Sequence, residues 1–191
     1  MINRILRFVR KKIYFITYKN KFKLLHPESY IHKLLRVDGM ENISIHKKVV
    51  IQKMTWIAAK PIKSSLNCDL IIGEGTTIGN FNHIYATRKI YIGKNVLTAD
   101  KVFISDNTHN YENINVPIIN QGIKQLSNVE IGDGSWIGEN AIIIGAKIGK
   151  NCVIGANSIV NKDIPDYCIA VGSPAKIIKK YNLEKEKWER F

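Results

Sequence analysis

The chain of 191 residues has few cysteines and no long apolar run. Its three cysteines, Cys68, Cys152 and Cys168, are odd in number and widely spaced, which fits neither a disulfide framework nor a zinc knuckle and favours a reducing compartment. No apolar run approaches the roughly 18 residues that a membrane span needs, and the start lacks the apolar stretch and cleavage site of a signal peptide. These absences predict a cytoplasmic protein that is neither secreted nor integral to a membrane.

Acidic residues are scarce in the first third of the chain. Residues 1–64 carry 15 Lys and Arg against 3 Asp and Glu, whereas residues 65–191 carry 14 against 13. Apolar residues recur at helical spacing within residues 1–24, with basic residues between them, which predicts a basic amphipathic helix. The apolar positions are Ile2, Ile5, Leu6, Val9, Ile13 and Ile16, and the basic ones are Arg4, Arg7, Arg10, Lys11 and Lys12.

Two interpretations of this helix remain open. Its apolar side can pack on the main domain or on a sister subunit, or the helix can lie on an anionic membrane surface, which would place the protein at the inner membrane face. Nucleic acid is not expected as a partner, because no RNP, zinc-finger or helix-turn-helix pattern accompanies the charge.

From residue 72 onward, apolar residues recur every sixth position. The dipeptide Ile-Gly occurs eight times, and small or branched residues tend to follow the first position of a repeat by four. The six-residue series runs through Ile72, Ile78, Ile84; Ile92, Thr98, Ile104; Ile131, Ile137, Ile143; and Ile148, Ile154, Val160. The second series is Thr76, Val96, Val102, Ser135, Ala141, Cys152 and Ser158.

A period of six matches neither an α-helix nor the alternation of a hairpin sheet. It suits a chain that makes a short strand and a turn, so that three hexapeptides complete a triangular coil and coils stack at about 4.8 Å. Each inward Ile or Val then contributes about 1.5–3 kcal/mol, and Gly, Asn and Asp at the corners accept positive φ angles. The pattern predicts an all-β solenoid.

The downstream repeats resemble the hexapeptide-repeat acyltransferases. The similarity covers roughly residues 40–180 and is carried by "SWIGENAIIIGAKIGKNCVIGANSIVNKDIPDYCIAVGSPAKIIKKY", from the repeats through "KDIP" to "GSPAK". The resemblance implies a left-handed parallel β-helix over residues 41–180, a homotrimer, and acetyl-CoA bound between subunits. Residues 1–40 would be the basic helical segment, and residues 181–191 a short C-terminal helix. Ile137 and Ile148 lie closer together by one position than two full repeats require, which predicts one contracted turn.

The six-residue count breaks between Ile104 and Ile131, whose separation is not a multiple of six. We expect an extruded loop at about residues 105–128, and loops on rigid scaffolds often carry catalytic groups. His109 follows Ile92 at an offset similar to that of the catalytic histidine in galactoside-type acetyltransferases, which implies a general base. Asp106 and Asn107 are candidates for acceptor contact, although Asp106 could equally cap a turn.

The resemblance also implies a set of residues that contact coenzyme A. Lysine stands at two of these positions, 176 and 179, where arginine is common in the family, so a phosphate there would keep a charge partner but lose the bidentate fork. Cys152 falls in the small inward series, which favours core packing over a nucleophile. The expected coenzyme A contacts are Trp136, Glu139, Ala156, Asn161, Lys162, Lys176 and Lys179.

These features predict an acetyl-CoA-dependent O-acetyltransferase acting on a sugar hydroxyl. The loop from Ser105 to Gly122 resembles loops of capsule, lipopolysaccharide and exopolysaccharide O-acetyltransferases, which favours a bacterial surface glycan as acceptor. A xenobiotic O-acetyltransferase and a nucleotide-sugar N-acyltransferase remain alternatives, although the latter typically carry a nucleotide-binding domain and residues 1–40 hold one glycine, Gly39. A non-catalytic scaffold explains the repeats alone. A γ-type carbonic anhydrase needs three converging histidines, and only His83 and His109 lie well inside the repeats, so no metal is expected.

Overall fold

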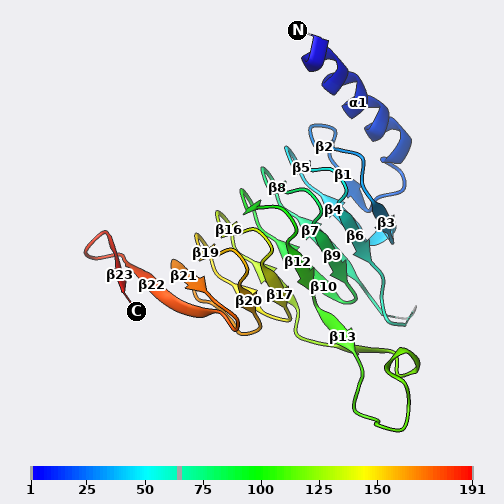
Figure 1. Cartoon of the computed structure of the whole chain (residues 1–191). Helices are drawn as coiled ribbons and strands as arrows, with labels where there is room; N and C mark the ends of the chain where they lie inside the picture. The colour runs from blue at the N-terminus through cyan, green and yellow to red at the C-terminus, as the bar shows by residue number, and fades with distance from the viewer. Residues whose placement is uncertain (1, 64–65, 191) are drawn as a thin grey trace.

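The computed structural model describes residues 2–63 and 66–190, except for the side chains of residues 2–5 and 7. Helix α1 (Ile2–Tyr18) projects from one end of a three-sided column of short strands (Figure 1). The helix predicted in the basic segment is therefore present, while the side chains of Ile2, Arg4, Ile5 and Arg7 lie outside the described residues. In the part of the chain that the structure describes, no helix combines the length and the apolar character needed to cross a bilayer.

Three sheets form the faces of the column, and each turn of the chain adds one strand to each sheet. The first sheet contains, in spatial order, β1 (Leu24–Leu25), β4 (Ile43–Ile45), β7 (Asp69–Ile72), β10 (Lys89–Ile92), β15 (Val129–Ile131) and β18 (Lys147–Ile148). The second contains β2 (Tyr30–Ile31), β5 (Val50–Ile51), β8 (Thr77–Ile78), β11 (Leu97–Thr98), β16 (Trp136–Ile137), β19 (Val153–Ile154), β21 (Cys168–Val171), β22 (Lys176–Asn182) and β23 (Lys187–Arg190). The third contains β3 (Arg36–Asp38), β6 (Trp56–Ala59), β9 (His83–Ala86), β12 (Phe103–Ser105), β17 (Ile142–Ile144) and β20 (Ile159–Val160).

Pairing within the column is parallel, and the predicted six-residue series forms its core. Ile72, Ile92, Ile131 and Ile148 stand opposite one another along the first sheet, each no more than 2 % exposed. The second series is also buried, and its hydroxyls find partners in the next coil. Ser135 Oγ, for example, donates a hydrogen bond to the Gly149 carbonyl at 2.8 Å. The expected inward positions are confirmed.

The corners need residues that tolerate a positive φ. Gly75 has φ of 74° and Asn95, one coil further, has φ of 52°. A Cβ at Gly75 would lie 2.2 Å from the Asn95 side-chain oxygen, so a larger residue at that corner would require the Asn95 side chain to move and would also adopt a strained positive φ.

Two more features of the column are one shortened turn and the position of its first coil. The contracted turn lies between Ile143 and Ile148, where Gly145 has φ of 54°, and pairing resumes with Ile131 opposite Ile148. The column also begins before residue 41, because β1, β2 and β3 already pair with β4, β5 and β6 as a complete coil. A 3-10 turn, η1 (Met40–Asn42), links this first coil to the second.

The prediction of a C-terminal helix over residues 181–191 is wrong, because the described residues up to Arg190 form strands and a turn. Strand β22 adds to β21 in antiparallel fashion and turns back into β23, with Tyr181 opposite Trp188 and their rings 5.4 Å apart. The open edge of β21 offers unpaired backbone groups. Pairing with that edge overrides the helix propensity of a Lys- and Glu-rich segment.

Candidate active site

Residues 107–125 leave the column as a two-stranded ribbon and a loop (Figure 1). Strand β13 (Asn107–His109) pairs antiparallel with β14 (Ile123–Gln125), and the 3-10 turn η2 (Ile118–Asn120) lies in the loop between them. Gln121 Nε2 donates hydrogen bonds to the carbonyls of Asn113 at 2.8 Å and Val116 at 2.7 Å. The loop is therefore held by its own polar contacts.

His109 is the last residue of β13, and its side chain is exposed. Its backbone is fixed in the ribbon opposite Ile123, and among the described residues no hydrogen bond to its ring is found. An exposed imidazole on a fixed strand can accept a proton from a bound hydroxyl near neutral pH.

Asp106 occupies the base of the ribbon and is 0 % exposed. Its Oδ1 accepts hydrogen bonds from the Thr87 backbone and hydroxyl, both at 2.8 Å, and from Asn107 Nδ2 at 3.2 Å. Its Oδ2 accepts from the backbone N–H groups of Arg88 and Lys89, both at 2.8 Å. Because both carboxylate oxygens are buried and occupied, this position does not fit the expected contact of Asp106 with the acceptor. It fits the alternative, a carboxylate that caps a turn.

Asn107 is also almost buried. Its Nδ2 donates to the Tyr85 carbonyl at 3.3 Å as well as to Asp106, and its N–H donates to Ser105 Oγ at 3.2 Å. Gln125, which the sequence did not single out, donates to the Asp106 carbonyl at 2.7 Å. These three residues anchor the ribbon that carries His109, and only the fold could show it because most of their partners are distant in the sequence.

The residues expected to contact coenzyme A lie at three places, on two different edges of the column and at its C-terminal end. Trp136 is half-exposed on the outer face of the second sheet, and Glu139 and Ala156 follow at the edge between the second and third sheets. Asn161 and Lys162 lie after β20, at the edge between the third and first sheets. Lys176 and Lys179 lie on β22, at the C-terminal end of the second sheet.

His109 belongs to the second of these two edges, because its ribbon leaves between β12 of the third sheet and β15 of the first. One chain therefore does not bring His109 and Trp136 to the same edge. Of the expected coenzyme A contacts, Asn161 and Lys162 share the edge of His109, whereas Trp136, Glu139 and Ala156 do not.

An aromatic row next to the ribbon was not predicted. His83 stacks on Trp56 with ring centroids 4.0 Å apart and meets Phe103 edge-on at 5.2 Å. Its Nε2 is buried and has no hydrogen-bond partner in the described part of the chain, and burial lowers the pKa of the ring. Within that same part, no three His, Cys, Asp or Glu side chains are grouped to hold a metal ion.

The cysteines are buried thiols. Burial raises the pKa of Cys68 to about 12, with the Asp106 and Asp69 carboxylates adding to the effect. Burial also raises the pKa of Cys152, which is 1 % exposed and donates to the Pro165 carbonyl. The core position predicted for Cys152 is confirmed, and such thiols are poor nucleophiles.

Known proteins resemble this chain in both sequence and structure. Residues 128–162 match the family described as hexapeptide repeat of succinyl-transferase. The chain is 32 % identical to galactoside O-acetyltransferase of Escherichia coli over 76 % of its own length and 70 % of that protein. The chain belongs to the hexapeptide-repeat acyltransferases. This membership implies that the column is a left-handed β-helix.

Other relatives are matched over a smaller share of their length. A probable acetyltransferase of Mycobacterium tuberculosis is 41 % identical over 88 % of this chain and 56 % of its own. WbbJ of Escherichia coli, whose name assigns it to lipopolysaccharide biosynthesis as an O-acetyl transferase, is 36 % identical over 63 % and 65 %. The chain thus spans between half and two thirds of these two relatives.

A solved structure shares the fold. AntD, an N-acyltransferase from Bacillus cereus in complex with coenzyme A and a dTDP-linked amino sugar, superposes with a TM-score of 0.72 at 20 % identity, over 89 % of this chain and 90 % of AntD.

Proposed function

We propose that this protein transfers the acetyl group of acetyl-CoA to a sugar hydroxyl, with His109 as general base. The observation that carries the proposal is an exposed imidazole fixed at the end of an anchored ribbon, in a chain of this family. The relatives named above support the reaction class, and AntD supports coenzyme A as the carrier.

The reaction needs only one protein base. The His109 ring takes the proton of the acceptor hydroxyl as the hydroxyl oxygen attacks the thioester carbonyl. The C–S bond then breaks, coenzyme A leaves as the thiolate and takes the proton from the His109 imidazolium, and the acceptor keeps the acetyl ester. No acyl-enzyme is formed, which agrees with the buried thiols.

The positions of the expected coenzyme A contacts suit a donor site between two copies of the chain. One copy would supply His109, Asn161 and Lys162, and its neighbour would supply Trp136 and Glu139 from the other edge. The loop tip supports such contact, because Ile114 and Ile119 are almost fully exposed in the single chain. Lys162, Lys176 and Lys179 offer charges to the coenzyme A phosphates. We therefore propose a homotrimer.

Mixing two variants, each expected to lose turnover because it lacks one side of the proposed site, tests whether the site is shared. His109→Ala and Trp136→Ala chains, co-refolded in equal amounts, should form trimers in which a wild-type loop meets a wild-type edge at about a quarter of the sites, by random assortment in a threefold ring. Acetyl-CoA turnover should rise to about that fraction of the wild-type value. Turnover that stays at the level of the separate variants, in mixed trimers verified by mass spectrometry, would show that each site belongs to one chain.

The acceptor that the comparisons favour is a glycan. WbbJ points to a surface polysaccharide and the galactoside enzyme to a simple sugar, whereas AntD favours a nucleotide-linked amino sugar as the second candidate.

An acceptor screen tests this choice. The protein is incubated with acetyl-CoA and, in separate reactions, a lipopolysaccharide or capsule saccharide, a simple glycoside, a nucleotide-linked amino sugar and a chloramphenicol-like drug. We expect thiol release together with an added acetyl group on a hydroxylated sugar, detected by mass spectrometry. Acetylation of the amino sugar alone, with an acetyl group that resists mild base as an amide does and an ester does not, would establish N-acyl transfer, and acetylation of the drug alone would establish a xenobiotic acceptor.

A further inference from the structure

Helix α1 packs on the column with only one of its faces. Tyr14, Phe15 and Tyr18 pack against the core of the first coil, and the rings of Tyr14 and Tyr18 lie 4.6 Å apart. Burial raises the pKa of the Tyr14 hydroxyl, as expected for a side chain in that contact. The helix is thereby held at the N-terminal end of the column.

The opposite face of α1 carries an apolar stripe with no cover. We define the stripe as Leu6, Val9, Ile13 and Ile16, whose spacing of three and four places them on one side of the helix. Their side chains are between 44 and 68 % exposed. An uncovered stripe on a helix points to a partner outside the described part of the chain.

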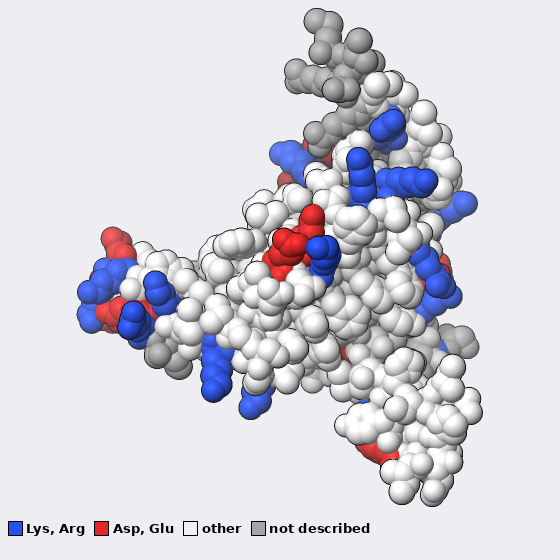
Figure 2. Space-filling view, in the orientation of Figure 1, with Lys and Arg blue, Asp and Glu red and all other residues white. Residues whose placement is uncertain are grey.

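Charge around the stripe indicates an anionic partner. Residues 1–27 contain eight Lys and Arg and no Asp or Glu. Arg10, Lys12, Lys19 and Lys21 are exposed, and none of the ion pairs found among the described residues involves them. Figure 2 shows Lys and Arg side chains gathered on α1 and on the adjoining end of the column. A second copy of this chain would bring the same positive charge, whereas an anionic lipid surface would neutralise it.

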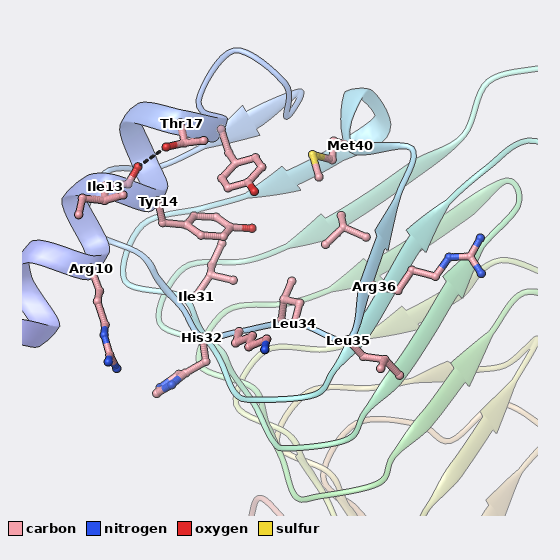
Figure 3. A pocket seen from close by; sticks show the side chains of 13 residues that line it. Arg10, Ile13, Tyr14, Thr17, Ile31, His32, Leu34, Leu35, Arg36 and Met40 are labelled. Atoms are coloured by element: carbon pink, nitrogen blue, oxygen red, sulfur yellow. Dashed lines mark hydrogen bonds between the residues drawn. The ribbon is translucent and has the colours of Figure 1, made fainter.

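A cavity of about 620 Å³ opens beside the stripe, between α1 and the segment 31–37. Ile13 belongs to both the stripe and the cavity wall, and Leu34 and Met40 line the inner part (Figure 3). Arg10 and His32 point to the same side of the cavity in Figure 3. A concave wall with apolar and basic groups suits a phospholipid, whose phosphate is anionic and whose chains are apolar.

We propose that α1 docks the protein on an anionic phospholipid membrane. The stripe enters the boundary between headgroups and acyl chains, and Arg10, Lys12, Lys19 and Lys21 lie among the lipid phosphates. In a homotrimer with parallel columns, as proposed above, three copies of α1 lie at the same end of the assembly. Three weak helices then bind one surface with the strength of a multivalent contact. Docking does not depend on the chemistry at His109.

Vesicle sedimentation tests the proposal with the full chain. We expect wild-type protein to pellet with vesicles that mix phosphatidylglycerol and phosphatidylcholine, and to remain in solution with phosphatidylcholine alone. Binding should weaken at least tenfold between about 0.05 and 0.5 M salt, because the Debye length shortens from roughly 14 to 4 Å. The variant Ile13→Glu/Ile16→Glu should lose vesicle binding. Leu183→Glu is the matched control, since Leu183 is 67 % exposed at the other end of the chain and should bind as wild type.

The same variants distinguish a membrane from a sister subunit. Sedimentation velocity should give the same oligomer for wild type and for Ile13→Glu/Ile16→Glu, and circular dichroism should show the fold intact. An oligomer that dissociates in the double variant would assign the stripe to a subunit interface and overturn the proposal. Failure of the wild type to bind anionic vesicles at low salt, or vesicle binding by the double variant equal to wild type, would overturn it as well.

Discussion

Replacing His109 by alanine should lower the turnover of acetyl-CoA by about 10²–10⁴-fold, the range for loss of a general base. The side chain is exposed at the end of β13 and packs against nothing that the fold needs, so the thermal transition should stay within about 1–2 °C of wild type, a shift expected for a surface change below roughly 0.5 kcal/mol. Turnover is measured by thiol release in the presence of the acceptor identified in the screen. The KM for acetyl-CoA should change little, because the imidazole acts on the acceptor proton.

The effect of removing His109 must be distinguished from the effect of removing any exposed imidazole. His46 is exposed at a corner between the first and second sheets, where none of the candidate site residues lies, so His46→Ala is the matched control and should retain full turnover. If the turnover of His109→Ala stays within threefold of wild type, the general-base mechanism is contradicted. An equal loss in the His46 variant would assign the effect to something other than proton transfer.

Replacing Asp106 by alanine should lower the free energy of unfolding by roughly 3–5 kcal/mol, because a buried multiple acceptor is lost and its donors are left unpaired. The backbone N–H groups of Thr87, Arg88 and Lys89 would have no partner, and Asn107 would lose one of its two acceptors. Urea unfolding followed by circular dichroism gives the value. Activity should fall with the fold, since this carboxylate anchors the ribbon under His109.

A conservative substitution and a surface aspartate complete this test. Asp106→Asn keeps the shape but places an NH₂ or a single oxygen where two acceptors were, so it should be destabilised by less than Asp106→Ala. Asp163 is exposed and accepts one backbone hydrogen bond, from Lys147 at 2.8 Å, and Asp163→Ala should cost about 1 kcal/mol or less. A role of Asp106 in acceptor binding would appear instead as a raised acceptor KM in the Asn variant, with its unfolding curve unchanged.

The anchoring of the ribbon explains how a solenoid can hold a catalytic loop. Each coil is a repeat of the last and offers no special site by itself. Here the Asp106 carboxylate ties the exit of the loop to the corner at residues 87–89 of the preceding coil, and Gln125 ties its return to the same place through the Thr87 hydroxyl at 3.0 Å. The ribbon therefore inherits the rigidity of the column, which a general base needs in order to meet its proton at a fixed position.

The sequence by itself determined the column. Because three short strands close one coil, residues separated by six positions face the same way, either into the column or out of it. Ile72, Ile92 and Ile131 could therefore be placed in the core from spacing alone. The same counting located the contracted turn before Ile148, and helical spacing with basic residues located α1. These features depend on residues that are neighbours in the chain or separated by a fixed repeat.

Only the tertiary structure decided the features that depend on partners outside the repeat. Aspartate in a polar stretch is expected to be an exposed loop residue. Asp106 is buried because its carboxylate accepts hydrogen bonds from backbone N–H groups of the preceding coil. The segment from Lys176 onward forms strands because the edge of β21 was open to pairing. Local residue propensities do not depend on such an edge and could not predict it. The separation of His109 and Trp136 onto different edges likewise follows from which sheet each strand joins. Backbone pairing and desolvation act between coils, so these positions were fixed only when the chain was folded.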